Sequence, residues 1–122
     1  MDHDRAAAFA REWIEAWNAA DLDRILSHYA DDFEMSSPLI RERMGVESGS
    51  LKGKDAIRPY WAIGLAAQPP LRFELIDVVA GVGAVAIYYR NLTRNRRVVE
   101  HFRFGGDGLV HQAQALYSPD DR

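Results

Sequence analysis

The sequence contains no cysteine, so it can form neither a disulfide framework nor a thiolate nucleophile. It also has no excess of basic residues, because its formal net charge is −3. Binding to nucleic acid requires a basic face, so we expect no nucleic-acid partner. No apolar run approaches the roughly 20 residues that span a bilayer, and the N-terminus has no signal pattern. We therefore expect no membrane association and a cytoplasmic location.

The residues that are present have the composition of an ordinary globular protein. The chain has 122 residues, of which 48% are hydrophobic and 27% are charged. This length is close to that of a typical domain, and the apolar content can form a core without a structural metal. We predict a single domain over residues 1–122.

The first part of the chain has the spacing of helices. Phe9, Trp13 and Trp17 recur at every fourth residue, which places them on one face of a helix. Asp21 has the short carboxylate of an N-cap. A second helix is predicted to follow it, with apolar residues at i, i+3, i+4 and i+7 (Leu22, Ile25, Leu26 and Tyr29), and to end at Asp31 and Asp32.

The middle of the chain has a less regular pattern. Residues 33–37 alternate and predict a strand, which Pro38 ends. Residues 39–53 are charged, contain three glycines and show no sustained period, so they predict a loop that is long enough to act as a lid. A third helix is predicted over residues 54–67.

The second half of the chain has the alternation of β-strands, separated by glycine-rich turns. Strands are predicted over residues 71–75, 84–93, 96–104 and 109–117. The basic run of Arg94, Arg96 and Arg97 begins between the second and third of these strands and predicts a solvated hairpin tip. Helices followed by strands are typical of an α+β fold with an antiparallel sheet.

Several short motifs occur in a characteristic order along the chain. They are WIEAWNAAD at 13–21, YADDF at 29–33 followed by Ser37-Pro38, GKDAIR at 53–58, and EHFRF at 100–104 continuing to Tyr117. Together they resemble the SnoaL-like, nuclear-transport-factor-2-like (NTF2-like) superfamily. The resemblance implies a cone-shaped, cystatin-like fold, in which helices pack into a strongly bent antiparallel sheet around a pocket. It also implies a homodimer formed through the outer face of the sheet.

The nearest mechanistic template is the ketosteroid isomerase branch of this superfamily. There, a carboxylate before a proline moves a proton, while a tyrosine and a protonated aspartate stabilise the enolate. The matching positions here are Ser37 for the base, Trp13 for the first-helix tyrosine and Glu100 for the strand acid, with Tyr29 and Trp61 at two supporting tyrosine positions. A serine hydroxyl without an adjacent base cannot remove an α-proton at neutral pH. We therefore predict that steroid isomerisation by that mechanism is absent.

Glu100 is the strongest candidate for a functional residue. Strand alternation places it on one face with Val98, Phe102 and Phe104, so the carboxyl group is expected inside the cone. Burial would raise its pKa and make it a general acid or a hydrogen-bond donor. The alternative is a structural role, in which Glu100 pairs with an arginine or accepts a bond from Trp13 Nε1.

His111 is a second candidate, because it alternates with Ala113, Ala115 and Tyr117 on the last predicted strand. It could act as a base in the pocket, although a lone histidine on an apolar face is more often structural. Glu42 or Glu47 could supply a base from the predicted loop. No histidines or carboxylates have the spacing of metal ligands, so we predict no metal and no cofactor.

The same aromatic residues are expected to form both the core and the pocket wall. The predicted pocket is apolar, with few polar groups, and suits a small hydrophobic molecule. Besides the four residues placed in catalytic positions (Trp13, Tyr29, Ser37 and Glu100), it is predicted to be lined by Trp17, Phe33, Met35, Tyr60, Trp61, Phe102, His111, Ala113, Ala115 and Tyr117.

Two functions are compatible with this pattern. The first is a cofactor-free acid–base enzyme, of the isomerase, cyclase or hydrolase type, in which Glu100 carries the proton while Trp13, Tyr29 and Ser37 orient the substrate. The second is a non-catalytic binding or dimerisation module with the same pocket. The second is favoured because both the carboxylate before Pro38 and the first-helix tyrosine are missing. Fold alone does not decide between them.

Overall fold

The computed structural model describes residues 1–119 of the chain. In chain order its elements are α1 (His3–Asn18), α2 (Leu22–Leu26), β1 (Tyr29–Ser36), α3 (Pro38–Met44), β2 (Ser50–Lys52), α4 (Lys54–Leu65), β3 (Phe73–Gly81), β4 (Ala84–Asn91), β5 (Arg96–Phe104) and β6 (Val110–Tyr117). The strands form one sheet in the order β2-β1-β6-β5-β4-β3. All neighbours are antiparallel except β1 and β6, which are parallel.

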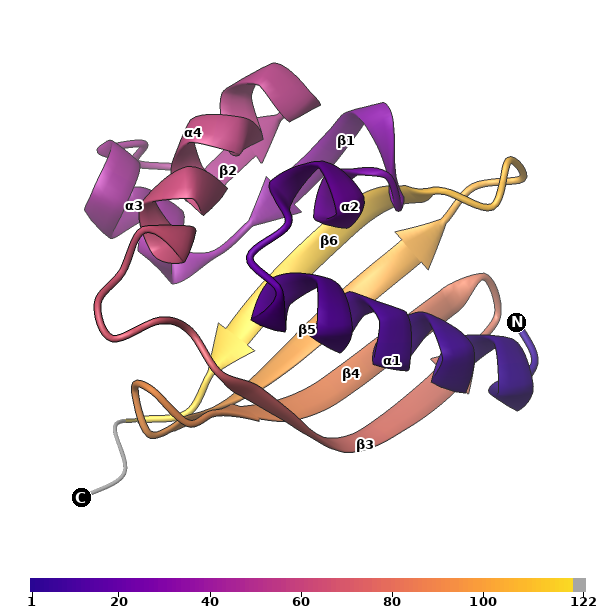
Figure 1. The fold of residues 1–122 in the computed structure, drawn as a ribbon. Helices are drawn as coiled ribbons and strands as arrows, with labels where there is room; N and C mark the ends of the chain where they lie inside the picture. The colour runs from indigo at the N-terminus through magenta and orange to yellow at the C-terminus, as the bar shows by residue number, and fades with distance from the viewer. Residues whose placement is uncertain (120–122) are drawn as a thin grey trace.

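The helices cover one face of a curved sheet. Figure 1 shows α1 lying across the strands of the second half, while α3 and α4 lie beside β1 and β2 at the other end of the curve. Within residues 1–119, none of the helices combines the length and the apolar character needed to cross a bilayer.

The predicted first helix is confirmed as α1. Asp2 begins it by accepting a hydrogen bond from the Arg5 backbone N–H, and its apolar face buries Trp13 and Trp17 against the sheet. Asp21 caps α2 as predicted, by accepting a bond from the Arg24 backbone N–H.

The second helix is shorter than predicted. It ends at Leu26, and Tyr29 is the first residue of β1, not part of the helix. Pairing with β6 explains the difference: Tyr29 lies opposite Val110, and the Val110 N–H donates to the His28 carbonyl. Sheet pairing here overrides a spacing that also fits a helix.

The predicted loop over residues 39–53 is wrong for most of its length. Ser37 accepts a hydrogen bond from the Leu39 N–H and caps α3, with Pro38 in the first turn, where its missing N–H has no cost. Gly45, with φ of 66°, ends α3 in the left-handed conformation that favours glycine. β2 then pairs with β1 at the edge of the sheet.

The remaining elements agree closely with the prediction. The third predicted helix is α4, and the four strands of the second half are β3 to β6, although β3 continues to Gly81 instead of ending near residue 75. The pairing of β3 with β4 contains one irregularity, a shift of register between Leu75 and Asp77.

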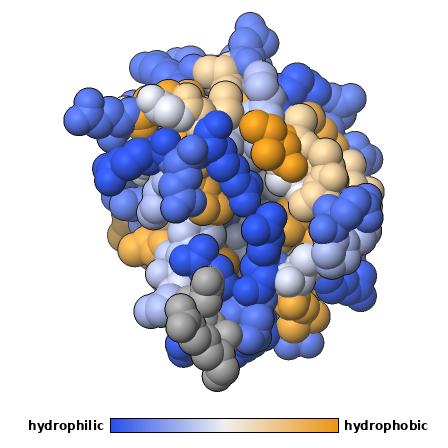
Figure 2. Space-filling view, turned by 90° about the vertical axis from the view of Figure 1, so that its left-hand side faces the viewer, coloured by the Kyte–Doolittle hydropathy of each residue, from blue (hydrophilic) through white to orange (hydrophobic). Residues whose placement is uncertain are grey.

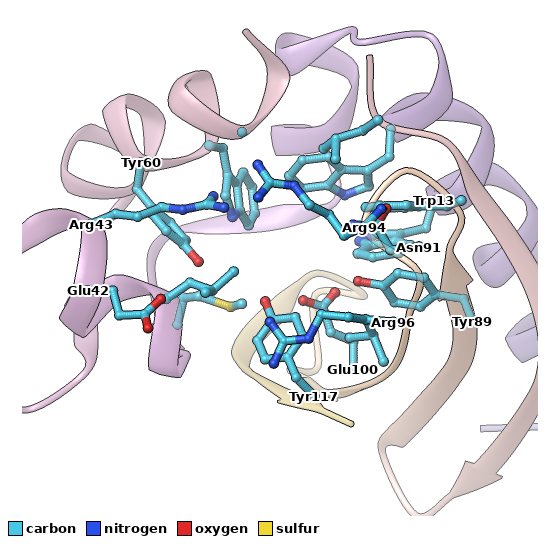
Figure 3. Close-up of a pocket in the computed structure, with 18 residues that line it drawn as sticks. Trp13, Glu42, Arg43, Tyr60, Tyr89, Asn91, Arg94, Arg96, Glu100 and Tyr117 are labelled. Carbon is cyan, nitrogen blue, oxygen red and sulfur yellow. The ribbon is translucent and has the colours of Figure 1, made fainter. Parts of the chain in front are cut away.

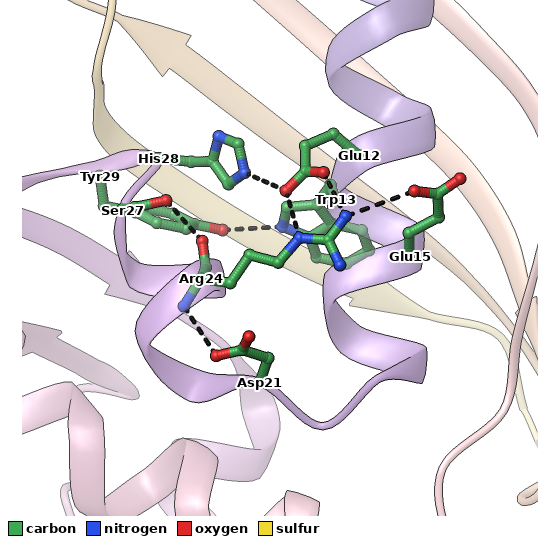
Figure 4. A network of polar contacts seen from close by, with 8 residues as sticks. All are labelled: Glu12, Trp13, Glu15, Asp21, Arg24, Ser27, His28 and Tyr29. Carbon is green, nitrogen blue, oxygen red and sulfur yellow. Dashed lines mark hydrogen bonds and ion pairs between the residues drawn. The ribbon is translucent and has the colours of Figure 1, made fainter.

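A polar network joins α1 to the segment that leads into β1 (Figure 4). The Arg24 guanidinium donates to the Glu12 carboxylate, and His28 Nε2 lies 3.0 Å from Glu12 Oε2. The bond from Arg24 holds the pKa of Glu12 at about 2, well below its usual value. On the inner side of the same segment, Trp13 Nε1 donates to the Tyr29 hydroxyl at 2.9 Å. These contacts hold α1, and with it Trp13, against the start of β1.

Candidate functional site

A cavity of about 490 Å³ opens between the inner face of the sheet and helices α1, α3 and α4. This volume is within the range of small-molecule sites. Its wall is aromatic, formed by Trp13, Trp17, Tyr60, Trp61, Phe73, Tyr89 and Tyr117. The other lining residues are Met35, Leu39, Glu42, Arg43, Gly64, Leu71, Asn91, Arg94, Arg96, Val98 and Glu100.

Glu100 lies in this cavity and is 7% exposed. It is held on β5 between Ile87 of β4 and Ala115 of β6, both of which are buried. Among residues 1–119, no hydrogen bond or ion pair reaches its carboxyl group. Because burial disfavours the charged form, the pKa of Glu100 rises to about 8.

The predicted burial of Glu100 and its raised pKa are confirmed. Neither of the two structural alternatives occurs within the described part of the chain: Trp13 Nε1 donates to Tyr29, and no arginine pairs with Glu100. The carboxyl group is therefore protonated over most of the range below pH 8 and can donate a hydrogen bond to a molecule in the cavity. Its catalytic role stays a prediction.

Tyrosine hydroxyls surround the Glu100 carboxyl group. Figure 3 shows the hydroxyl groups of Tyr89 and Tyr117 on either side of it and that of Tyr60 across the cavity. Burial raises the pKa of Tyr89 and of Tyr117, and the nearby Glu100 charge raises both further. Burial also raises the pKa of Tyr60. All three phenols thus remain neutral in the physiological range and can serve as hydrogen-bond donors.

Ser37 lies behind two of these tyrosines and does not line the cavity. Its hydroxyl donates to the Tyr117 hydroxyl at 3.3 Å and accepts from Tyr60 at 3.4 Å, while also capping α3. The side chain is buried and has no carboxylate or imidazole partner. This geometry gives Ser37 a positioning role for the tyrosines and leaves the usual base position without a base.

The predicted lining residues fall into two groups. Trp13, Trp17, Met35, Tyr60, Trp61, Tyr117 and Glu100 do line the cavity. Tyr29, Phe33, Phe102, Ala113 and Ala115 are buried in the core outside it. The aromatic residues of the cavity wall are thus also part of the buried core, as predicted, whereas the five residues of the second group belong to the core alone.

The placement of His111 in the pocket is wrong. Its side chain is 43% exposed and pairs with Asp107 in the hairpin before β6, with 3.0 Å between Nε2 and the carboxylate oxygens. The register shifts between β5 and β6 at this point, so that Phe104 faces Val110 while Arg103 faces Gln112. Such a bulge adds one residue to the strand and reverses the alternation on which the prediction relied.

The mouth of the cavity is charged, so the prediction of few polar groups is also wrong. Arg43 and Glu42 come from α3, and Arg94 and Arg96 come from the turn and strand after β4. Figure 2 shows this side of the molecule, where hydrophilic side chains predominate. The alternation of β4 from Val85 would have identified Tyr89 as a residue that lines the cavity. The arginines of the mouth could not be identified without knowing the position of α3 and of the hairpin between β4 and β5.

The described residues include no group of three or more histidine, cysteine, aspartate or glutamate side chains placed to hold a metal ion. The groups available for chemistry in the cavity are therefore the Glu100 carboxyl, the tyrosine hydroxyls, and the ionic side chains of the mouth.

Comparison with known proteins agrees with this architecture. The family model of the SnoaL-like domain matches residues 10–113. A SnoaL-like protein of unknown function from Burkholderia thailandensis has 50% sequence identity, with 97% of this chain and 98% of that chain covered and a TM-score of 0.92.

More distant structures share the fold. One is described as a "putative ketosteroid isomerase" from Kribbella flavida, with 15% identity, a TM-score of 0.71, and coverage of 98% of this chain and 82% of that chain. Another is AclR, described as a "putative hydroxylase" from Streptomyces galilaeus, with 21% identity, a TM-score of 0.73, and coverage of 96% and 91%. Structures described as cystatin-like and NTF2-like also match, so the fold predicted from the sequence motifs is confirmed.

Proposed function

The chain belongs to the SnoaL-like domain family, and on this premise we propose that it is a cofactor-free acid–base enzyme for a small aromatic or polycyclic molecule that bears a carbonyl group. One observation carries the proposal: a buried carboxyl group, Glu100, faces an open cavity with no partner among residues 1–119 and a pKa of about 8. A buried, unpaired acid has a folding cost that a purely structural role does not explain.

The proposed reaction is proton abstraction next to the carbonyl carbon. A substrate carbonyl oxygen accepts a hydrogen bond from the protonated Glu100 carboxyl. When the α-C–H bond breaks, its electron pair forms the C=C bond of the enolate and the π pair of the carbonyl moves to the oxygen, where Glu100 donates a hydrogen bond. The tyrosine hydroxyls beside Glu100 can share that oxygen.

The removed proton needs an acceptor, and Glu42 is the other carboxylate that lines the cavity. It lies on α3 and is exposed at the mouth, where its carboxylate oxygens are free to meet a bound molecule. We assign the base role to Glu42, because Ser37 at the position before Pro38 has no means of accepting a proton. Steroid isomerisation with the base before the proline is therefore not part of the proposal.

Proton exchange into a bicyclic ketone tests this proposal. 1-Tetralone is incubated with the protein in D2O, and loss of the α-proton signal is followed by NMR. We expect exchange above the buffer background, with a loss of at least about 100-fold in Glu100→Gln. The control is Arg103→Gln, an exposed change outside the cavity. Exchange at the background rate, or an unchanged rate in Glu100→Gln, would contradict the proposal.

A non-catalytic binding module is the second candidate. The observation in its favour is that Ser37 occupies the base position and is fully engaged in holding Tyr60 and Tyr117. In that case ketones would bind with measurable affinity while exchange stayed at the background rate, so the same experiment separates the two functions.

We further propose that two copies pair through the outer face of the sheet. Tyr88, Val99 and Leu116 are adjacent in register across β4, β5 and β6 on the side away from the helices. Val99 is 36% exposed and Leu116 is 48% exposed. A contiguous row of apolar side chains on an exposed sheet face supports an association site.

A further inference from the structure

The cavity mouth has a charge of its own, opposite in sign to that of the whole chain. The formal net charge of the protein is −3. Three arginines, Arg43, Arg94 and Arg96, nevertheless line the cavity, and the carboxylates that line it are Glu42 and Glu100. Glu100 is buried and protonated below about pH 8, so positive charge predominates at the mouth.

Arg43 is more enclosed than Arg94, which is exposed. It is half-buried on the last turn of α3, and its Nη1 atom lies near Gly64 of α4. Its charge is close enough to Tyr60 and Tyr117 to favour their ionised forms slightly. Among residues 1–119 it makes no ion pair or hydrogen bond.

Arg94 reaches the mouth from the opposite side, on the turn between β4 and β5. In Figure 3 the side chains of Arg43 and Arg94 enter the opening from its two sides and point toward one another. The Arg94 guanidinium likewise has no ionic partner within the described part of the chain. Two like charges that converge without a carboxylate between them repel each other unless an anion lies between them.

Arg96 has a different role. Its Nε donates to the Ser118 carbonyl at 3.1 Å, and its guanidinium lies 5.2 Å from the centre of the Tyr117 ring. These contacts position it at the wall next to Tyr117 and add positive charge near the opening. Arg43 and Arg94 are therefore the two groups available to bind an anion, and Arg96 is their fixed neighbour.

We propose that the substrate is a carboxylic acid: an aryl ketone whose ring system lies against the aromatic wall, whose carbonyl meets Glu100, and whose carboxylate is held at the mouth by Arg43 and Arg94. A planar guanidinium matches a carboxylate with two parallel hydrogen bonds, which makes arginine suited to this recognition. The carbonyl group of this substrate rests on the proposed function. Its carboxylate rests only on the arginines at the cavity mouth.

Two matched compounds test the inference by equilibrium binding. Naphthoylpropionate carries a naphthyl ketone and a carboxylate, and naphthoylpropionamide has the same shape without the charge. Isothermal titration calorimetry gives the dissociation constant of each for the wild-type protein. We expect the acid to bind at least about 10-fold more tightly than the amide at about 20 mM NaCl, with a smaller ratio at about 300 mM NaCl.

The variants locate the source of this preference. Arg43→Gln and Arg94→Gln should each lower the acid-to-amide ratio several-fold, while Glu42→Gln should raise it because a repelling carboxylate is removed. Arg103→Gln removes the same charge from an exposed position outside the cavity and should leave the ratio unchanged.

Equal binding of the two compounds, tighter binding of the amide, or no binding of either up to about 2 mM would overturn the inference. So would a preference that neither Arg43→Gln nor Arg94→Gln reduces. Its failure is distinct from failure of the proposed function, because the ratio of the two dissociation constants requires no turnover. If 1-tetralone exchanges its α-proton but the acid binds no more tightly than the amide, the proposed enzyme function stands and the proposed carboxylate of the substrate is wrong.

Discussion

Replacing Glu100 with glutamine should stabilise the protein by an amount that grows with pH. In the unfolded chain a glutamate has its usual pKa of 4.5, whereas in the fold burial raises it to about 8. Between these values the unfolded state has lost the proton and the native state keeps it, so the free energy of unfolding falls as pH rises. Glutamine has no such proton, and its contribution is the same at every pH.

The size of the effect follows from the separation of the two pKa values. The free energy of unfolding of Glu100→Gln relative to wild type should rise by about 1.4 kcal/mol per pH unit between about pH 5 and pH 8. Over this window the increase amounts to about 4 kcal/mol, a large part of the stability of a typical domain. Below pH 4.5 and above pH 8 the difference should be constant, because both states then have the same protonation.

Urea unfolding at pH 5, 6, 7 and 8 measures this difference, with tryptophan fluorescence as the signal. Trp13, Trp17 and Trp61 are all buried at the cavity wall, so unfolding exposes every indole in the chain. Titration of the histidines and other groups cancels in the comparison of wild type with variant. Glu42→Gln removes an exposed carboxylate and is the control that should show no such slope. A Glu100→Gln difference that is the same at all four pH values would refute the reasoning.

Three further perturbations test separate parts of the structure. Ser37→Ala removes the cap of α3 and the partner of two tyrosine hydroxyls, and should lower the free energy of unfolding in urea by about 1 to 2 kcal/mol; no change would show that the cap is dispensable. Trp13→Phe leaves the buried Tyr29 hydroxyl without its donor and should cost about 1 to 3 kcal/mol beyond lost packing. In the double variant Trp13→Phe/Tyr29→Phe part of that cost should be recovered. If the two changes in the free energy of unfolding simply add, the hydrogen bond makes no contribution of its own. Val99→Glu places a charge in the apolar row beside Leu116, and the variant should be a monomer by multi-angle light scattering where the wild type forms the proposed dimer; a monomeric wild type would refute the interface.

The fold could be predicted well wherever one spacing fits one structure. The aromatic residues of α1 recur at a helical period, and the face of β5 that carries Glu100 alternates without interruption. Tyr29 fits both a helix and a strand, and the long-range pairing with β6 decided in favour of the strand. α3 was missed because its seven residues are too few to show a period, and because Pro38 signals a helix start as well as a strand end.

The candidate site could be predicted in part. Glu100 was found because a carboxylate among apolar residues on one strand face must be buried or break the pattern. His111 was misplaced because a β-bulge reverses alternation and leaves no mark in the sequence. Arg43 and Arg94 come from elements that are far apart in the chain and meet only through the curvature of the sheet, so no local pattern identifies them as neighbours.

The most direct test of the account is an NMR titration of the Glu100 side-chain carboxyl carbon, assigned by its absence in Glu100→Gln. The account predicts a midpoint near pH 8, which means a neutral acid facing the cavity at physiological pH. A midpoint near the ordinary value of 4.5 would mean that the carboxyl group is ionised and compensated in the native protein. That result would remove the proton donor from the proposed reaction and leave a binding pocket in its place.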